Sequence, residues 1–184
     1  MSRTLVKILD ATIFPAALMI AGKFIGLYLS IKIFELEWGI ENLSNELFSS
    51  RPVMYKQDIL TASSYSDLFL LLVMLGGFSL YVARAVFFHD SHVNPKILTR
   101  LAANGLLGLV KDSFEIYHRA SVWLIFLWLS NITILINVLI GKTYTWVLLV
   151  GFVASILLTV ILLRDVAYEI NLAKKGLNGK NQKA

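Results

Sequence analysis

Four long apolar runs dominate the sequence and constrain its fold more than any other feature. A helix needs roughly 20 mostly apolar residues to cross a hydrocarbon core about 30 Å thick, because each residue adds about 1.5 Å. The runs that reach this length cover residues 11–34, 67–88, 120–140 and 144–163. Lipid cannot bond to open backbone groups, and these runs do not alternate as barrel strands do, so each is predicted to be a transmembrane helix.

The composition agrees with a membrane fold. Only 16% of the residues are charged, against about a quarter in a soluble domain. The net charge of +5 lies in short connectors and not on a soluble face, which argues against nucleic acid as a partner. Since the chain has no cysteine, it has no disulfide or thiolate metal site, and we expect no cofactor. The predicted class is an all-α membrane protein: one four-helix transmembrane bundle over 1–170 and a basic, disordered tail over 171–184.

The basic residues predict which way the helices run. Lys and Arg in short loops favour the cytoplasmic side of a membrane. With the N-terminus inside, twelve of the 17 Lys and Arg residues lie on the inner side, four lie outside, and Lys23 falls within the first span. Both termini are therefore predicted to be cytoplasmic, and the expected location is a bacterial cytoplasmic membrane.

The two longer connectors differ in character. Residues 95–111 of the inner connector are apolar but too few to span, so we predict an additional cytoplasmic interfacial amphipathic helix there. Its basic residues Lys96, Arg100 and Lys111 would reach anionic lipid headgroups. Two glycines within it leave a re-entrant turn as the alternative. The outer connector, 35–66, is long enough for a short helix around 40–48.

Lys23 is the sharpest single signal for a site, because an ionisable group inside a membrane costs on the order of 3 kcal/mol to insert. Gly26 and Ser30 share its helix face, which makes that face small and polar and suited to close packing. The favoured interpretation is structural: Lys23 bonds to a neighbouring helix or extends toward the headgroups. The alternative is a role in transport or proton relay.

The third span supplies a counterpart for Lys23. Three of its polar residues share one face: Ser130, Thr133 and Asn137. Such stripes usually join helices by hydrogen bonds, so structural bonding is the favoured interpretation. The alternative is a hydrated path that these residues and Lys23 line, with Asp67 at its outer mouth. Asn131 points to a different face and would need another partner.

Histidines and carboxylates gather around the inner connector. The candidate metal ligands are His89, Asp90, His92, Glu115 and His118. Imidazole and carboxylate groups bind Zn²⁺ and similar ions, and both ends of the connector return to the same membrane face. Because nothing in the sequence fixes the distance between the two ends, ordinary interface positions are the favoured interpretation.

Three functions follow from these features, since the four-span layout alone does not determine one. The leading hypothesis is a structural or accessory subunit that packs in the lipid bilayer with copies of itself or with another membrane protein. The second is a small channel or transporter that uses Lys23 and the polar face of the third span. The third is a membrane enzyme with a metal at the His/Asp/Glu cluster.

Overall fold

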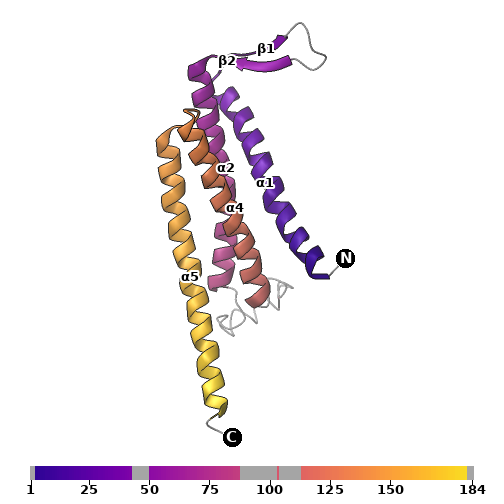
Figure 1. Ribbon diagram of the computed structural model, residues 1–184, viewed down its shortest axis with the longest axis vertical. Helices are drawn as coiled ribbons and strands as arrows, with labels where there is room; N and C mark the ends of the chain where they lie inside the picture. Colours follow the sequence, from indigo (N-terminus) through magenta and orange to yellow (C-terminus); the bar gives the residue numbers. More distant parts are fainter. Residues whose placement is uncertain (1–2, 43–49, 88–102, 104–112, 182–184) are drawn as a thin grey trace.

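The computed structural model describes residues 3–42, 50–87, 103 and 113–181, which form four long helices and a two-stranded hairpin (Figure 1). The helices are α1 (Arg3–Ile33), α2 (Lys56–Phe87), α4 (Ser113–Leu139) and α5 (Thr145–Asn181). The strands are β1 (Trp38–Asn42) and β2 (Ser50–Met54), which pair antiparallel between α1 and α2.

All four helices contain a stretch long and apolar enough to cross a membrane, as the sequence predicts. These stretches are Thr12–Ile33, Lys56–Val86, Glu115–Leu139 and Thr145–Asn171. The helices themselves run further than the predicted spans. Helix α2, for example, begins at Lys56, where Asp58 in the first turn complements the positive end of the helix dipole.

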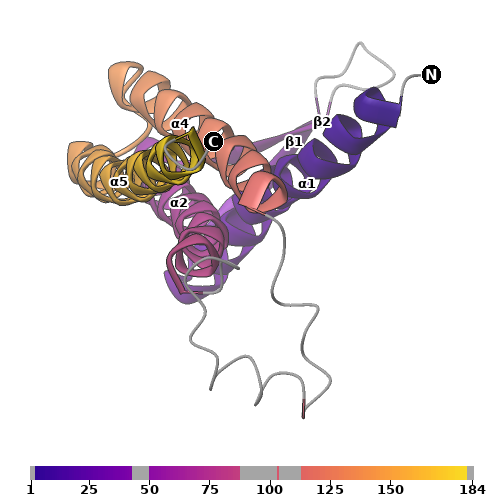
Figure 2. The ribbon, with the colours of Figure 1, turned by 90° about the horizontal axis from the view of Figure 1, so that it is seen from below.

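Helix α2 is central, because it packs against each of the other three helices. Helix α4 also contacts α1 and α5. Seen along the helices, α1 leans away from the rest toward its N-terminus (Figure 2). The first turn of α1 and the last turn of α5 both point away from the hairpin, toward what is here called the terminal end, and α5 extends furthest (Figure 1). The hairpin and the α4–α5 turn lie on the opposite side, here called the hairpin end.

The core is hydrophobic and lies mainly between α2 and α4, with Val147 and Leu162 added by α5. Helix α2 contributes the buried side chains Leu70, Leu71, Met74, Phe78, Val82 and Ala85. Helix α4 contributes Ile116, Ala120, Trp123, Leu127 and Ile134. Many large apolar side chains on α1 and α5 are instead exposed, for example Phe24 at 68% and Leu157 at 59%. This pattern fits a chain whose outward faces meet lipid.

Two expectations differ from the structure. Residues 38–42 form a strand where a helix over 40–48 is expected, and residues 43–49 lie outside the described part. Helix α5 runs on to Asn181, into the tail predicted to be disordered over 171–184. That tail contains no proline, so an existing helix can extend through it without a new nucleus, although Gly176 and Gly179 lower its helix propensity.

The predicted interfacial helix over 95–111 lies outside the described residues, except for Ala103. The same holds for Lys96, Arg100 and Lys111, so their contact with lipid headgroups stays a prediction.

Candidate functional site

The carboxylate of Asp67 on α2 is fully buried and lies where three other segments meet. Lys23 of α1 forms an ion pair with its Oδ1. Its Oδ2 accepts hydrogen bonds from Asn137 Nδ2 of α4 at 2.9 Å and from Thr143 Oγ1 of the α4–α5 turn at 2.5 Å. These four residues are called the Asp67 cluster below. Both carboxylate oxygens thus have donors, as a buried charge requires.

Glycines bring α1 close enough for Lys23 to reach Asp67. A Cβ atom added at Gly26 would lie 2.8 Å from Phe69 Cβ and 2.9 Å from the Ser66 carbonyl oxygen of α2. Only glycine fits at this contact without a shift of backbone atoms. Ser66 Oγ also donates to the Lys23 carbonyl oxygen at 2.7 Å. The α1–α2 contact therefore positions the ion pair through both backbone and side-chain atoms.

The end of α4 positions the other two members of the cluster. Gly141 has a φ of 71°, a left-handed conformation that glycine adopts at no steric cost. Its N–H donates to the Val138 carbonyl at 3.0 Å, and the Lys142 N–H donates to the Asn137 carbonyl at 2.8 Å. These are the two bonds of a Schellman cap. The cap turns the chain back so that Asn137 and Thr143 both face Asp67.

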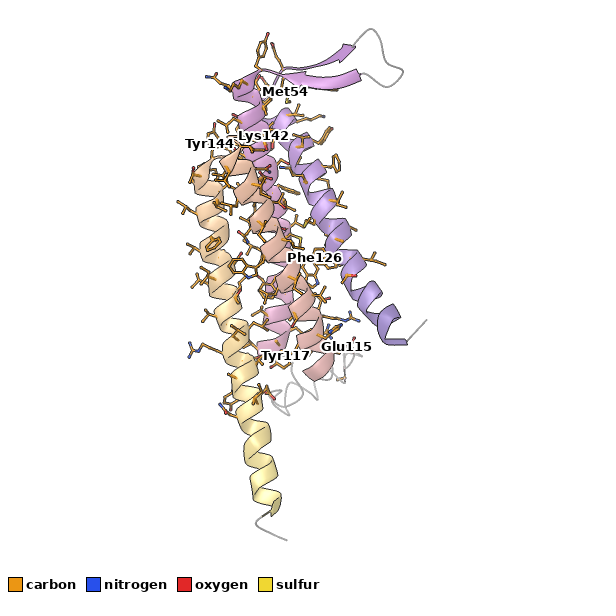
Figure 3. All side chains as sticks on the ribbon, in the orientation of Figure 1. Met54, Glu115, Tyr117, Phe126, Lys142 and Tyr144 are labelled. Atoms are coloured by element: carbon orange, nitrogen blue, oxygen red, sulfur yellow. The ribbon has the colours of Figure 1, made fainter. Side chains whose placement is uncertain are left out.

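The α4–α5 turn is also bonded to α2. The Tyr144 N–H donates to Ser64 Oγ at 2.9 Å, and Ser64 Oγ donates to the Leu60 carbonyl at 2.6 Å. Figure 3 labels Lys142 and Tyr144, on either side of Thr143, at the hairpin end, and Glu115 and Tyr117 at the opposite end. The Asp67 cluster therefore lies level with the α4–α5 turn, at one edge of the α4 span.

The charges within the cluster balance. The Asp67 side chain is 0% exposed and the Lys23 side chain is 35% exposed. One ammonium group at Oδ1 neutralises the carboxylate, while two uncharged donors bond to Oδ2. Removal of a single partner from such a pair leaves an uncompensated buried charge, which is why buried pairs are much more costly to break than to replace.

The structure brings together three of the five predicted intramembrane site residues: Lys23, Asp67 and Asn137. The other two donate to carbonyls of their own helix, Ser130 to Phe126 at 2.9 Å and Thr133 to Leu129 at 2.9 Å. Serine and threonine in helices commonly bond back by four residues in this way. Thr143 was not predicted, although Gly141, just beyond a span, is the usual signal of a cap that reverses the chain.

Asn131 finds its partner on α5. Its Nδ2 donates to Ser155 Oγ at 2.8 Å and to the Leu127 carbonyl at 3.0 Å. The buried Oδ1 has no hydrogen-bond partner among the described residues, and a Cβ at Gly151 would lie 2.7 Å from it. Gly151 therefore leaves room for the amide, and the α4–α5 contact contains one unsatisfied acceptor.

The predicted metal site lies mostly outside the described part, which omits His89, Asp90 and His92. Glu115 and His118 lie on α4, where Glu115 Oε1 is 2.8 Å from Arg119 Nη2. Among the described residues, no three potential ligands come together as a metal ion would require. A metal at this cluster stays a prediction.

Comparison with known proteins adds no relative. No family model matches the chain, and no curated protein or solved structure does either. The structure has four helices long and apolar enough to span a membrane among its described residues, which is compatible with a membrane protein.

Proposed function

We propose that this chain is an integral membrane protein that acts as a structural or accessory subunit, by helix packing in the bilayer with copies of itself or with another membrane protein. The observation that carries the proposal is the Asp67 carboxylate. Donors from α1, α4 and the α4–α5 turn occupy both of its oxygens. The buried carboxylate on α2 thus links α2 to α1, α4 and the α4–α5 turn.

The buried face of α2 supports packing over transport. From the Asp67 cluster toward the terminal end, its buried residues are Leu70, Leu71, Met74, Phe78, Val82 and Ala85. A path for ions or protons needs polar groups or water along its whole length. A polar cluster at one end of the α4 span, next to a hydrophobic face of α2, is consistent with a structural role.

The outer helices offer surfaces for assembly. In the most apolar stretches of α1 and α5, 17% and 22% of the residues are buried within the chain, against 33% in α2 and in α4. Helix association in lipid is driven by van der Waals packing and not by release of water. Exposed apolar faces of this kind suit contact with another transmembrane helix as well as with lipid.

Cysteine crosslinking tests the proposal, because the chain has no cysteine of its own. Leu157→Cys on α5 and Ile20→Cys on α1 introduce thiols at positions that are 59% and 57% exposed. Leu162→Cys, at a position 4% exposed, is the matched buried control. We expect at least one exposed position to crosslink to a neighbouring protein in native membranes, and the buried control not to. The proposal would be contradicted if neither exposed position crosslinks and single-molecule counting in bilayers finds only monomers.

A small channel or transporter is the second candidate, favoured by the 35% exposure of the Lys23 side chain beside buried Asp67. Ion and proton flux into reconstituted vesicles tests it. Flux that Lys23→Met abolishes, and that Lys32→Met at an exposed position of the same helix preserves, would replace the structural proposal with transport.

The proposed setting is a bacterial cytoplasmic membrane with both termini inside. The basic residues of the connectors support this orientation. Helix α1 begins and helix α5 ends on the side away from the hairpin, as expected for four spans (Figure 1). Labelling of single cysteines at the two ends with a membrane-impermeant reagent in intact cells tests the orientation.

A further inference from the structure

A cavity of about 430 Å³ opens where α1 leans away from α2 and α4. Phe14 and Leu18 of α1 line one side of it, and Leu80 and Arg84 of α2 and Trp123 of α4 line the others. Its volume lies within the range of about 300–1,000 Å³ that is typical of ligand sites. The cavity lies in the half of the molecule nearer the terminal end, away from the Asp67 cluster.

Aromatic rings form fixed walls for this cavity. The Trp123 ring occupies the space that a side chain at Gly77 would need, so it packs directly on the α2 backbone. Phe14 meets Trp123 edge to face with the ring centroids 6.1 Å apart, and the centroid of Tyr81 lies 5.7 Å from that of Trp123. Rings packed in this way hold a preformed apolar surface.

Arg84 contributes a guanidinium group to the lining of the cavity. It lies in the last turn of α2 and is the one charged residue among the described residues that line the cavity. A guanidinium group carries five N–H donors and binds phosphate well. A second cavity, of about 260 Å³ between α1 and α2 at the hairpin end, has no charged residue among its described lining residues.

We propose that the cavity at Arg84 binds one acyl chain of an anionic glycerophospholipid from the leaflet at the terminal end, with the phosphate of the headgroup on Arg84. An acyl chain in a bilayer is already out of water, so its entry gains packing contacts and little hydrophobic free energy. Selectivity therefore comes from the headgroup. One basic residue near an anionic headgroup corresponds to about a fivefold preference over a zwitterionic lipid.

Fluorescence of Trp123 can report the bound chain directly. The substitutions Trp38→Phe, Trp128→Phe and Trp146→Phe leave Trp123 as the single tryptophan. The protein is then reconstituted in phosphatidylcholine with a minor fraction of brominated phosphatidylglycerol or of brominated phosphatidylcholine. We expect Trp123 to associate about fivefold more strongly with the brominated anionic lipid. Arg84→Gln should abolish this preference, and Arg164→Gln, at an exposed position on α5, should preserve it.

Native mass spectrometry of the chain with all four tryptophans tests lipid binding independently of the folding of the single-tryptophan variant. It should find one phosphatidylglycerol retained in preference to phosphatidylcholine, and this preference should be lost with Arg84→Gln. Equal quenching by the two brominated lipids, or a preference that survives Arg84→Gln, would overturn the proposal. Quenching of Trp123 by a brominated free fatty acid but by neither phospholipid would also overturn it.

Discussion

The two halves of the α1–α2 contact differ in what holds the helices together. At the hairpin end, Gly26 lies against the backbone of Ser66, and the Lys23–Asp67 ion pair closes the contact. Toward the terminal end, α1 leans away, and Phe14 reaches Trp123 across the edge of a cavity. Backbone contact and charge hold the two helices close together at the hairpin end. Toward the terminal end the helices diverge, and an aromatic pair bridges α1 and α4.

The largest effect should come from Asp67→Ala, which leaves the Lys23 ammonium without its counter-charge. Loss of one partner of a fully buried pair typically costs about 3–5 kcal/mol, and the 35% exposure of the Lys23 side chain places the expected loss at the lower end of this range. Steric trapping of the reconstituted protein measures this loss in the free energy of unfolding. Asp58→Ala, in the first turn of the same helix, is the control and should cost far less, about 0.5 kcal/mol. If the two variants lose similar free energies of unfolding, the Asp67 cluster does not make a special contribution to stability.

Gly26→Ala should follow, with a loss of about 2 kcal/mol, because its Cβ would lie within 3 Å of the α2 backbone. The matched control is Gly76→Ala on α2, where an added Cβ meets nothing within 4 Å. That control should be neutral or slightly stabilising, since alanine favours helix over glycine. If both substitutions are neutral in the same unfolding assay, the hairpin end is not a close backbone contact.

Phe14→Ala tests the terminal half of the same interface. We expect a loss of about 1 kcal/mol, since Phe14 is 60% exposed and makes one edge-to-face contact with Trp123. Ile13→Ala, at a neighbouring position that is 62% exposed, supplies the baseline for loss of a lipid-facing side chain. A loss of stability as large as that of Gly26→Ala would mean that both halves of the α1–α2 contact stabilise the position of α1 equally.

The smallest effect should come from Thr133→Ala. The Thr133 hydroxyl donates to the Leu129 carbonyl of its own helix, and within the described part of the chain it bonds to no other segment. Its removal should change the free energy of unfolding by less than about 0.5 kcal/mol. A loss comparable to that of Phe14→Ala would indicate that Thr133 contacts a partner helix or another copy of the chain.

The spans and the ion-paired lysine could be predicted from sequence because both follow from the cost of polar groups in lipid. Length and hydropathy identify the four helices, and Lys23 must find a partner or reach the headgroups. The sequence suggests Asp67 only as the outer mouth of a hydrated path that Lys23 lines. The structure instead makes Asp67 the centre of the site, because three donors from different segments converge on it.

The remaining features depend on tertiary geometry. Ser130 and Thr133 share a helix face with Asn137, but short hydroxyl side chains can bond to their own backbone, whereas the longer amide of Asn137 reaches across to Asp67. Helical periodicity does not distinguish these cases. Strands β1 and β2 have five residues each, too few for an alternating pattern to stand out from the surrounding loop.

The position of the ion pair along the chain bears on how the protein enters its membrane. Lys23 and Asp67 belong to α1 and α2, which are synthesised before α4 and α5, so the opposite charges can enter the bilayer together as a neutral pair. Neither charge has to wait in lipid for α4 or α5. Asn137 and Thr143 arrive with the second hairpin and bring only uncharged donors, so the later step of assembly completes the hydrogen bonds of Asp67 without moving a charge.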